Sequence, residues 1–358
     1  MKKYLSAGAA LMLTTSAAFA GGIDRSGQSI AVLFEEGTYA EISFGSAAPE
    51  ITGHMIGVTA AETGDIAPDY TTFGLAFKMD VNDQVSLAFI SDEPFGADVS
   101  YDAATYPLVG AGAEVNTRGL TILGQYQINE NVSVYAGPRI VSADGQYRGP
   151  TALGGYVSNY EKGTDVGYVI GAAYEIPEIA LRGSLTYSSQ TEFELDGDGA
   201  GGAGDLSATM PQSVNLEFQT GIAADTLAMV SVRWADWSEA TIDDAVAGNL
   251  TDFGNADTMT YSVGIGRRFT DNFSGLVSVG YEKATGDTTG QLSPTDGYLS
   301  LSLGGAYTLD NGMEISGGVR YVNIGDADSE AIAAAGFPGG RFEDNYAIGY
   351  GLKLAYNY

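Results

Sequence analysis

The chain has 358 residues, among them 50 Gly, 22 Tyr, one His and no Cys, and its formal net charge is −29. Without Cys, disulfides, thiolate metal sites and Cys nucleophiles are excluded, and His54 has no acid–base group beside it in sequence, so we expect no cofactor, metal or catalytic centre. The strong negative charge disfavours nucleic acid as a partner.

The first residues have the pattern of a secretory leader. Lys2 and Lys3 precede an uncharged stretch, and Ala18-Phe19-Ala20 matches the small-residue cleavage pattern. We therefore interpret residues 1–20 as a signal peptide. No later run of about 18 apolar residues offers a transmembrane helix.

About fourteen segments with alternating apolar and polar residues follow. In the last of them the even-numbered residues 346 to 358 are Tyr, Ile or Leu, whereas the residues between them are small or polar. Because strand side chains alternate between two faces, this pattern predicts a long apolar face with aromatic ends, typical of a membrane barrel. The expected strands are 37–47, 70–80, 84–95, 116–127, 132–147, 161–175, 179–193, 212–223, 226–237, 258–269, 272–283, 297–308, 313–323 and 343–358.

The connections alternate between two kinds. Short turns such as Asn82-Asp83 and Asp310-Asn311-Gly312 alternate with long excursions such as 48–69 and 324–342. Short periplasmic turns and long outer loops are typical of outer-membrane barrels, and a soluble β-sandwich or propeller would not need apolar, aromatic-flanked faces on nearly every strand. We therefore predict an all-β fold, a transmembrane antiparallel β-barrel of about 14 strands over residues 37–358. We expect a monomer in a Gram-negative outer membrane, in contact with outer-membrane lipid and lipopolysaccharide.

Several short motifs carry a family resemblance through their order and spacing. They include Leu33-Phe34-Glu35-Glu36-Gly37-Thr38-Tyr39, Pro49-Glu50-Ile51-Thr52-Gly53, Glu93-Pro94-Phe95-Gly96, Met210-Pro211-Gln212-Ser213 and Arg233-Trp234-Ala235-Asp236-Trp237-Ser238. The sequence resembles the FadL-type long-chain fatty acid transporters, an outer-membrane family that also includes aromatic-hydrocarbon uptake proteins. The resemblance implies a fourteen-stranded barrel that takes up hydrophobic molecules, most simply long-chain fatty acids, and releases them sideways at a kinked third strand.

The resemblance also implies an N-terminal hatch inside the barrel. Family members usually carry a longer hatch with an Asn-Pro-Ala motif, whereas here the corresponding place reads Gln28-Ser29-Ile30-Ala31. We therefore expect residues 21–36 to form a short hatch-like plug segment.

A kink is expected where Asp92, Pro94, Phe95 and Gly96 interrupt the third strand. Pro94 has no amide hydrogen for the ladder, and Gly96 relaxes the backbone. The family resemblance makes this kink a candidate lateral opening. The alternative is a strand that ends at its outer loop.

Strand parity points Met229, Arg233 and Trp237 into the lumen, and also Arg139. An inward Trp is a candidate wall of an apolar ligand pocket, or alternatively an anchor at the rim. An arginine without a partner could hold a fatty acid carboxylate in its guanidinium fork, although charges in a narrow lumen usually pair with each other. The candidate ligand-binding residues are therefore Trp237, Arg233, Arg139 and Met229.

Three functions are compatible with these patterns. The leading hypothesis is a passive channel for hydrophobic molecules. The alternatives are a structural or adhesive barrel with a plugged lumen, and a general porin for small polar solutes. A hydrophobic molecule bound inside the barrel would favour the first, and a continuous water-filled bore the last.

Overall fold

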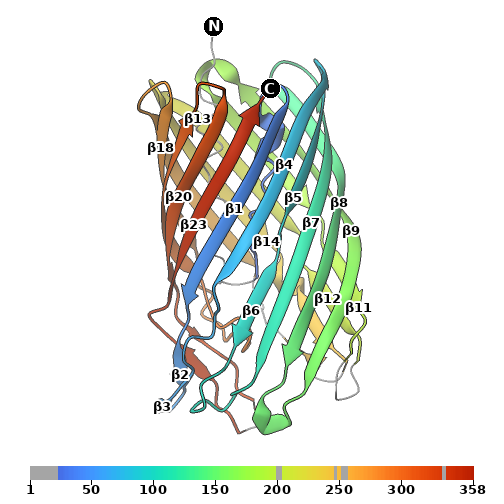
Figure 1. The fold of residues 1–358 in the computed structure, drawn as a ribbon, viewed down its shortest axis with the longest axis vertical. Helices are drawn as coiled ribbons and strands as arrows, with labels where there is room; N and C mark the ends of the chain where they lie inside the picture. The colour runs from blue at the N-terminus through green and yellow to red at the C-terminus, as the bar shows by residue number, and fades with distance from the viewer. Residues whose placement is uncertain (1–22, 199–203, 246–247, 251–256, 333–335) are drawn as a thin grey trace.

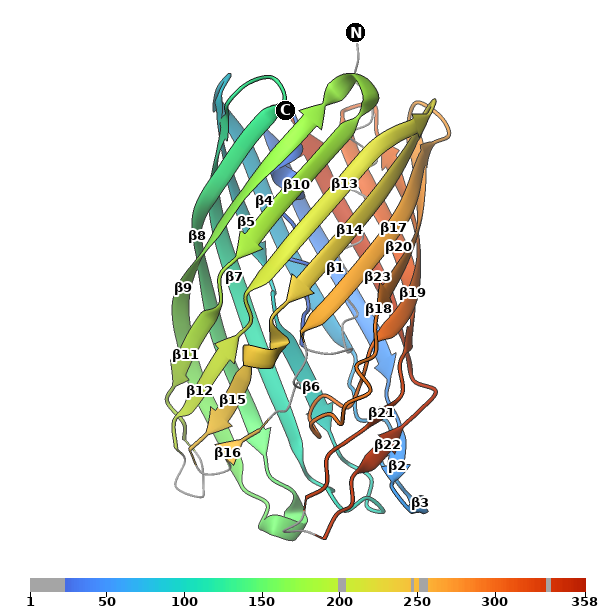
Figure 2. The ribbon, with the colours of Figure 1, turned by 180° about the vertical axis from the view of Figure 1, so that it is seen from behind.

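The computed structural model describes residues 23–198, 204–245, 248–250, 257–332 and 336–358, so the predicted signal peptide lies outside the described residues. The described residues form a closed antiparallel barrel of fourteen strands (Figures 1 and 2). These strands are β1 (Tyr39–Glu50), β4 (Tyr70–Asn82), β5 (Val85–Asp92), β7 (Gly112–Gln127), β8 (Val132–Arg148), β9 (Val157–Ile176), β10 (Leu181–Ser188), β13 (Ser213–Ala223), β14 (Thr226–Ala235), β17 (Thr258–Arg268), β18 (Phe273–Glu282), β19 (Tyr298–Thr308), β20 (Met313–Ile324) and β23 (Tyr346–Asn357). In this described part of the chain, no helix is long and apolar enough to cross a membrane.

The last strand closes the barrel with the parity that the sequence predicts. β23 pairs with β1 on one side and with β20 on the other. Tyr350 and Leu352 are 55% and 46% exposed on the outer surface, whereas Ala347 and Ala355 are buried on the inside. The C-terminus lies at the end of the barrel that carries the short turns (Figure 1).

Two predicted strand ends are wrong, and a third strand breaks at the expected kink. The strand expected over 179–193 ends at Ser188: after the irregular residues 189 and 190, Thr191–Leu195 form a separate strand that pairs with Leu206–Met210. The strand expected over 226–237 ends at Ala235, and Trp237 opens a 3-10 turn, η4 (Trp237–Glu239). The strand expected over 84–95 breaks after Asp92.

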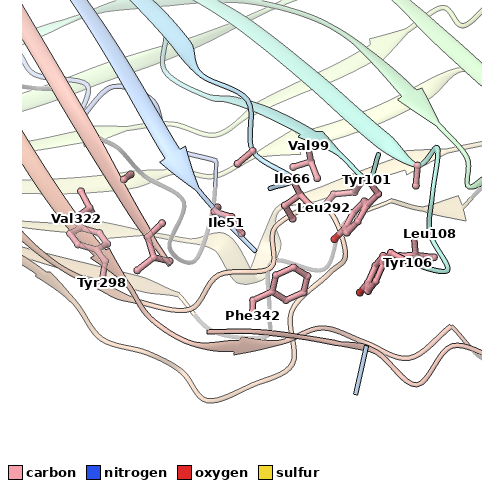
Figure 3. Packing of buried hydrophobic residues seen from close by; sticks show 14 of the residues in the cluster. Ile51, Ile66, Val99, Tyr101, Tyr106, Leu108, Leu292, Tyr298, Val322 and Phe342 are labelled. Atoms are coloured by element: carbon pink, nitrogen blue, oxygen red, sulfur yellow. The ribbon is translucent and has the colours of Figure 1, made fainter. Parts of the chain in front are cut away.

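The long loops, which lie at the opposite end from the C-terminus, contain small sheets that strand periodicity did not predict. One has the order β11 (Thr191–Leu195), β12 (Leu206–Met210), β15 (Thr241–Asp244), β16 (Gly248–Asn249); the other has the order β21 (Ala327–Asp328), β22 (Gly340–Phe342), β2 (Gly53–Met55), β3 (Val58–Glu62). Buried apolar residues from several loops pack together at this outer end (Figure 3). Among them Tyr101 and Tyr106 stack with ring centroids 5.4 Å apart.

The N-terminal segment packs against the inward face of the barrel strands. Its short helix η1 (Ala31–Phe34) buries Val32 and Leu33 in a cluster that includes Leu123 and Tyr135 of the barrel wall. The rings of Phe34 and Tyr135 meet edge to face at 6.2 Å. Further 3-10 turns occur outside the barrel strands, η2 (Thr151–Leu153) and η3 (Pro177–Ile179).

Candidate functional site

The third barrel strand is interrupted by a bulge. β5 and the short strand β6 (Gly96–Ser100) both pair with β7, with Asp92 opposite Gly119 and Gly96 opposite Asn116. Three residues on one strand therefore face two on the other, as in a β-bulge. The Thr117 hydroxyl holds the bulge: it accepts the Phe95 amide at 2.9 Å and donates to the Phe95 carbonyl at 2.6 Å. The strand thus continues beyond the kink and does not simply end at its loop.

The bulge leaves a gap in the wall. β4 pairs with β5 only as far as Leu75 opposite Ser91, and in the described part of the chain β6 has no ladder pairing with β4. The stretch 70–74 of β4 is therefore paired with β1 but lacks a strand neighbour on the other side.

The N-terminal segment lies along this gap. Gly96 donates its amide to the Ile23 carbonyl at 2.8 Å, and Arg25 donates its amide to the Pro94 carbonyl at 2.9 Å. The guanidinium of Arg25 stacks on the Tyr70 ring, 3.7 Å from its centroid. Backbone groups freed by the bulge are thus paired with the N-terminal segment.

Both candidate carboxylate-binding arginines contact this segment. Arg233 donates Nε and Nη2 to the two carboxylate oxygens of Asp24, at 3.2 and 3.0 Å, in the bidentate geometry expected for a ligand carboxylate. Arg139 donates Nη1 to Gln28 at 2.5 Å, and its Nη2 lies 3.6 Å from Asp92. The chain's own residues therefore occupy the forks that the sequence suggested for a fatty acid.

Trp237 and Phe95, two of the predicted site residues, meet in the outer half of the barrel. Their rings pack edge to face at 5.9 Å, and Trp237 is only 1% exposed. They belong to a cluster of apolar residues that also contains Ile23, Ala97 and Met210. Beside this cluster lies a cavity of about 40 Å³, lined by Ile23, Ala97, Ala113, Glu114, Val115, Ala143, Asp144, Gly145, Gln146, Tyr147, Tyr160, Leu195, Leu206, Ala208, Met210, Ile242, Leu250 and Leu292. We call this cavity the apolar pocket.

The lumen on the other side of the bulge has a different character. A cavity of about 170 Å³ there is lined by Glu35, Glu41, Arg182, Glu217 and Lys353 among other residues, and Lys353 Nζ lies 3.1 Å from Glu41 Oε2. Met229 lines this charged cavity and not the apolar pocket. Burial raises the pKa of Glu35 to about 7, although Lys353 opposes the shift.

The sequence model of the family described as outer membrane protein transport protein (OMPP1/FadL/TodX) matches residues 23–358. The chain belongs to this family. No curated protein sequence matches it. This FadL/TodX-family channel is therefore an outer-membrane protein of a Gram-negative bacterium, and its family consists of transport channels for hydrophobic substrates. The predicted family and the predicted location are confirmed.

Solved structures share the fold of this FadL/TodX-family channel at low sequence identity. They include a Pseudomonas aeruginosa FadL homologue (TM-score 0.74, 14% identity, 91% of each chain), the P. putida toluene transporter TodX (0.69, 12%, 92% of each chain) and the Ralstonia pickettii toluene transporter TbuX (0.67, 12%, 98% of each chain). At this identity the likeness establishes the barrel fold and not the substrate.

Sequence reasoning missed several residues of the site in this FadL/TodX-family channel. Thr117 gives no sequence signal, because its role depends on lying opposite a bulge in another strand. Asp24 does give one: a carboxylate in a segment expected inside the lumen is a natural partner for lumen arginines such as Arg233.

Proposed function

We propose that the protein is a passive outer-membrane channel that takes long-chain fatty acids, or other hydrophobic molecules, into the apolar pocket and releases them sideways through the gap beside the bulge. The observation that carries this proposal is the position of the pocket. Ile23 and Ala97, which line it, adjoin the interrupted strand, and the lumen beyond the bulge is charged.

Transfer energies favour the sideways route. An acyl chain gains about 0.8 kcal/mol for each CH₂ kept away from water. A path to the periplasm would lead along Glu41, Arg182 and Lys353, whereas a path through the gap leads from one apolar surface to another. The N-terminal segment packed inside the lumen argues against an open porin for polar solutes.

The apolar pocket is narrow in this structure. Its volume of about 40 Å³ is well below the roughly 150 Å³ of an apolar cavity that holds benzene. Ligand entry therefore requires the pocket to widen. Ile23 forms part of its lining, so movement of the N-terminal segment would enlarge the pocket, which supports the hatch role proposed for residues 21–36.

Monoaromatic hydrocarbons are the second candidate ligands. Arg233 and Arg139, which could bind a carboxylate, already contact Asp24 and Gln28, so a ligand without a charged group suits this site better. Two of the similar solved structures are of toluene transporters, so toluene is the monoaromatic compound chosen for the test.

Uptake by cells that lack the gene tests the proposal. Initial uptake of labelled oleate and labelled toluene is measured with the wild type, with Ala208→Ile, and with Thr209→Ile on the opposite face of the same strand. Ala208 is buried in the wall of the apolar pocket, so the larger Ile side chain should fill the pocket and reduce uptake of the natural ligand. The Thr209→Ile control should transport normally. If Ala208→Ile folds and transports both compounds at the wild-type rate, the apolar pocket is not on the route.

A further inference from the structure

A charged pair spans the outer side of the wall gap. Arg118 of β7 has the parity of Leu120, which is exposed on the outer surface, and its own side chain is 45% exposed. It donates Nη1 to the carbonyl of Phe73 on β4 at 2.9 Å, and its Nη2 lies 2.9 Å from Glu93 Oε1. The same Glu93 oxygen accepts the amide of Phe73 at 3.3 Å.

These contacts replace a strand. Elsewhere neighbouring barrel strands are joined by backbone ladders, but here the amide and carbonyl of Phe73 are paired with two side chains. A backbone group at a membrane wall needs a partner, because lipid supplies none. A side chain meets this need reversibly: Arg118 can swing away by rotating its own bonds, without breaking any ladder hydrogen bond.

The pair lies at the outer edge of the apolar belt. Outward residues of β7 change from Glu114, Asn116 and Arg118 to Leu120 and then Tyr126 along the strand. Arg118 is therefore placed where a long cationic side chain can extend its head from an apolar surface toward water.

We propose that Arg118 and Glu93 form a latch that closes the wall gap from outside and opens to let a hydrophobic ligand pass. The proposal rests on the lateral release proposed above and identifies the residues that control it. Arg25 lies at the same gap: a Cβ added at Gly96, which is opposite the outward Asn116, would lie 2.7 Å from its Nε, so its side chain runs along the outer edge of β6.

Removing the latch tests its role. The variant Arg118→Met keeps a long side chain but loses both contacts. An exposed ion pair is worth about 0.5–1 kcal/mol, so initial oleate or toluene uptake should rise about two- to five-fold. The matched control is Arg341→Met, which breaks another exposed pair, with Asp328 in the outer loops at 2.8 Å, and should leave uptake unchanged.

Locking the gap tests the route itself. The chain has no Cys, so Phe73→Cys with Arg118→Cys supplies two outward thiols that a short bifunctional thiol reagent can bridge across the gap. The bridged barrel should lose at least nine-tenths of its uptake. The control pair is Leu301→Cys with Tyr321→Cys, which bridges exposed residues already opposite each other in the β19–β20 ladder and should transport normally after treatment.

The outcomes separate the latch from the channel function. Faster uptake in Arg118→Met together with loss of uptake on bridging supports the latch. Loss on bridging with an unchanged Arg118→Met rate overturns the latch and leaves lateral release intact. Full uptake by the bridged barrel, when Ala208→Ile is inactive, overturns both the latch and lateral release but keeps the pocket on the route. Full uptake by both variants overturns the proposed function as well.

Discussion

The pair between Asp24 and Arg233 should hold the N-terminal segment against the wall gap. These residues are 209 positions apart, and their side chains are only 16% and 13% exposed. Replacing Arg233 with Met leaves the Asp24 carboxylate without its bidentate partner in a narrow lumen. The segment should then detach more often from the bulge, while the barrel ladder stays intact.

The size of the effect follows from the burial of the pair. Breaking a fully buried ion pair costs about 3–5 kcal/mol, and coupling between contacting residues is about 0.5–3 kcal/mol. For this largely buried pair we expect about 1–3 kcal/mol, which shifts the opening equilibrium about 5- to 140-fold.

Amide hydrogen exchange measures this opening of the N-terminal segment directly. The amides of Arg25 and Gly96 bond across the interface between the segment and the bulge, to the carbonyls of Pro94 and Ile23. Their exchange should accelerate about 5- to 140-fold in Arg233→Met, as stated above. Ladder amides of β19 should not change.

Three further variants complete the test. Arg268→Met breaks a charged pair with Asp225 at the rim with the short turns and should leave the Gly96 amide protected. Asp24→Asn alone and Asp24→Asn combined with Arg233→Met give the coupling energy by a double-mutant cycle. Unchanged protection of Gly96 in Arg233→Met would show that the pair does not hold the segment, and the reasoning would fail.

Three other results are expected. Thr117→Val leaves both backbone groups of Phe95 without their hydroxyl partner and should destabilise the barrel by about 1–3 kcal/mol in denaturant unfolding. The control Thr121→Val, at a buried position on the same strand, should destabilise it less. Equal losses of stability would contradict the role of the Thr117 hydroxyl. The pKa of Glu35 is raised to about 7 from 4.5, so this group stabilises the docked N-terminal segment fully below about pH 4.5, and the stabilisation is lost as the pH rises through 7. Protease cleavage near Leu33 should therefore be faster at pH 8 than at pH 5. Glu35→Gln should remove that difference. Deleting residues 356–358 removes the hydrogen bond that the Tyr358 amide donates to the Thr38 carbonyl at 2.8 Å and the contact of the Tyr356 and Tyr358 rings at 4.6 Å. No heat-modifiable barrel should then form on gel electrophoresis.

The alternation of side chains was enough to predict the barrel. Tyr350 and Leu352 face outward and Ala347 inward because each follows the parity of its own strand, which the sequence displays directly. The kink was equally visible, since Pro94 removes a ladder donor whatever its surroundings. The predicted end at residue 193 failed because residues 191–195 leave the barrel sheet and pair with residues 206–210, a partner that local periodicity does not reveal.

The tertiary structure alone decided what the site residues contact. Parity pointed Arg139 and Arg233 inward, but it could not show that Gln28 and Asp24 occupy their guanidinium groups. Parity points Arg118 outward with Leu120, but it could not show that this side chain contacts Phe73 and Glu93 across the gap in the wall. Periodicity reports which face a residue takes on its own strand. Contacts across the lumen or across a bulge depend on the order and register in which distant strands close the barrel, and these are set by the packing of the whole chain.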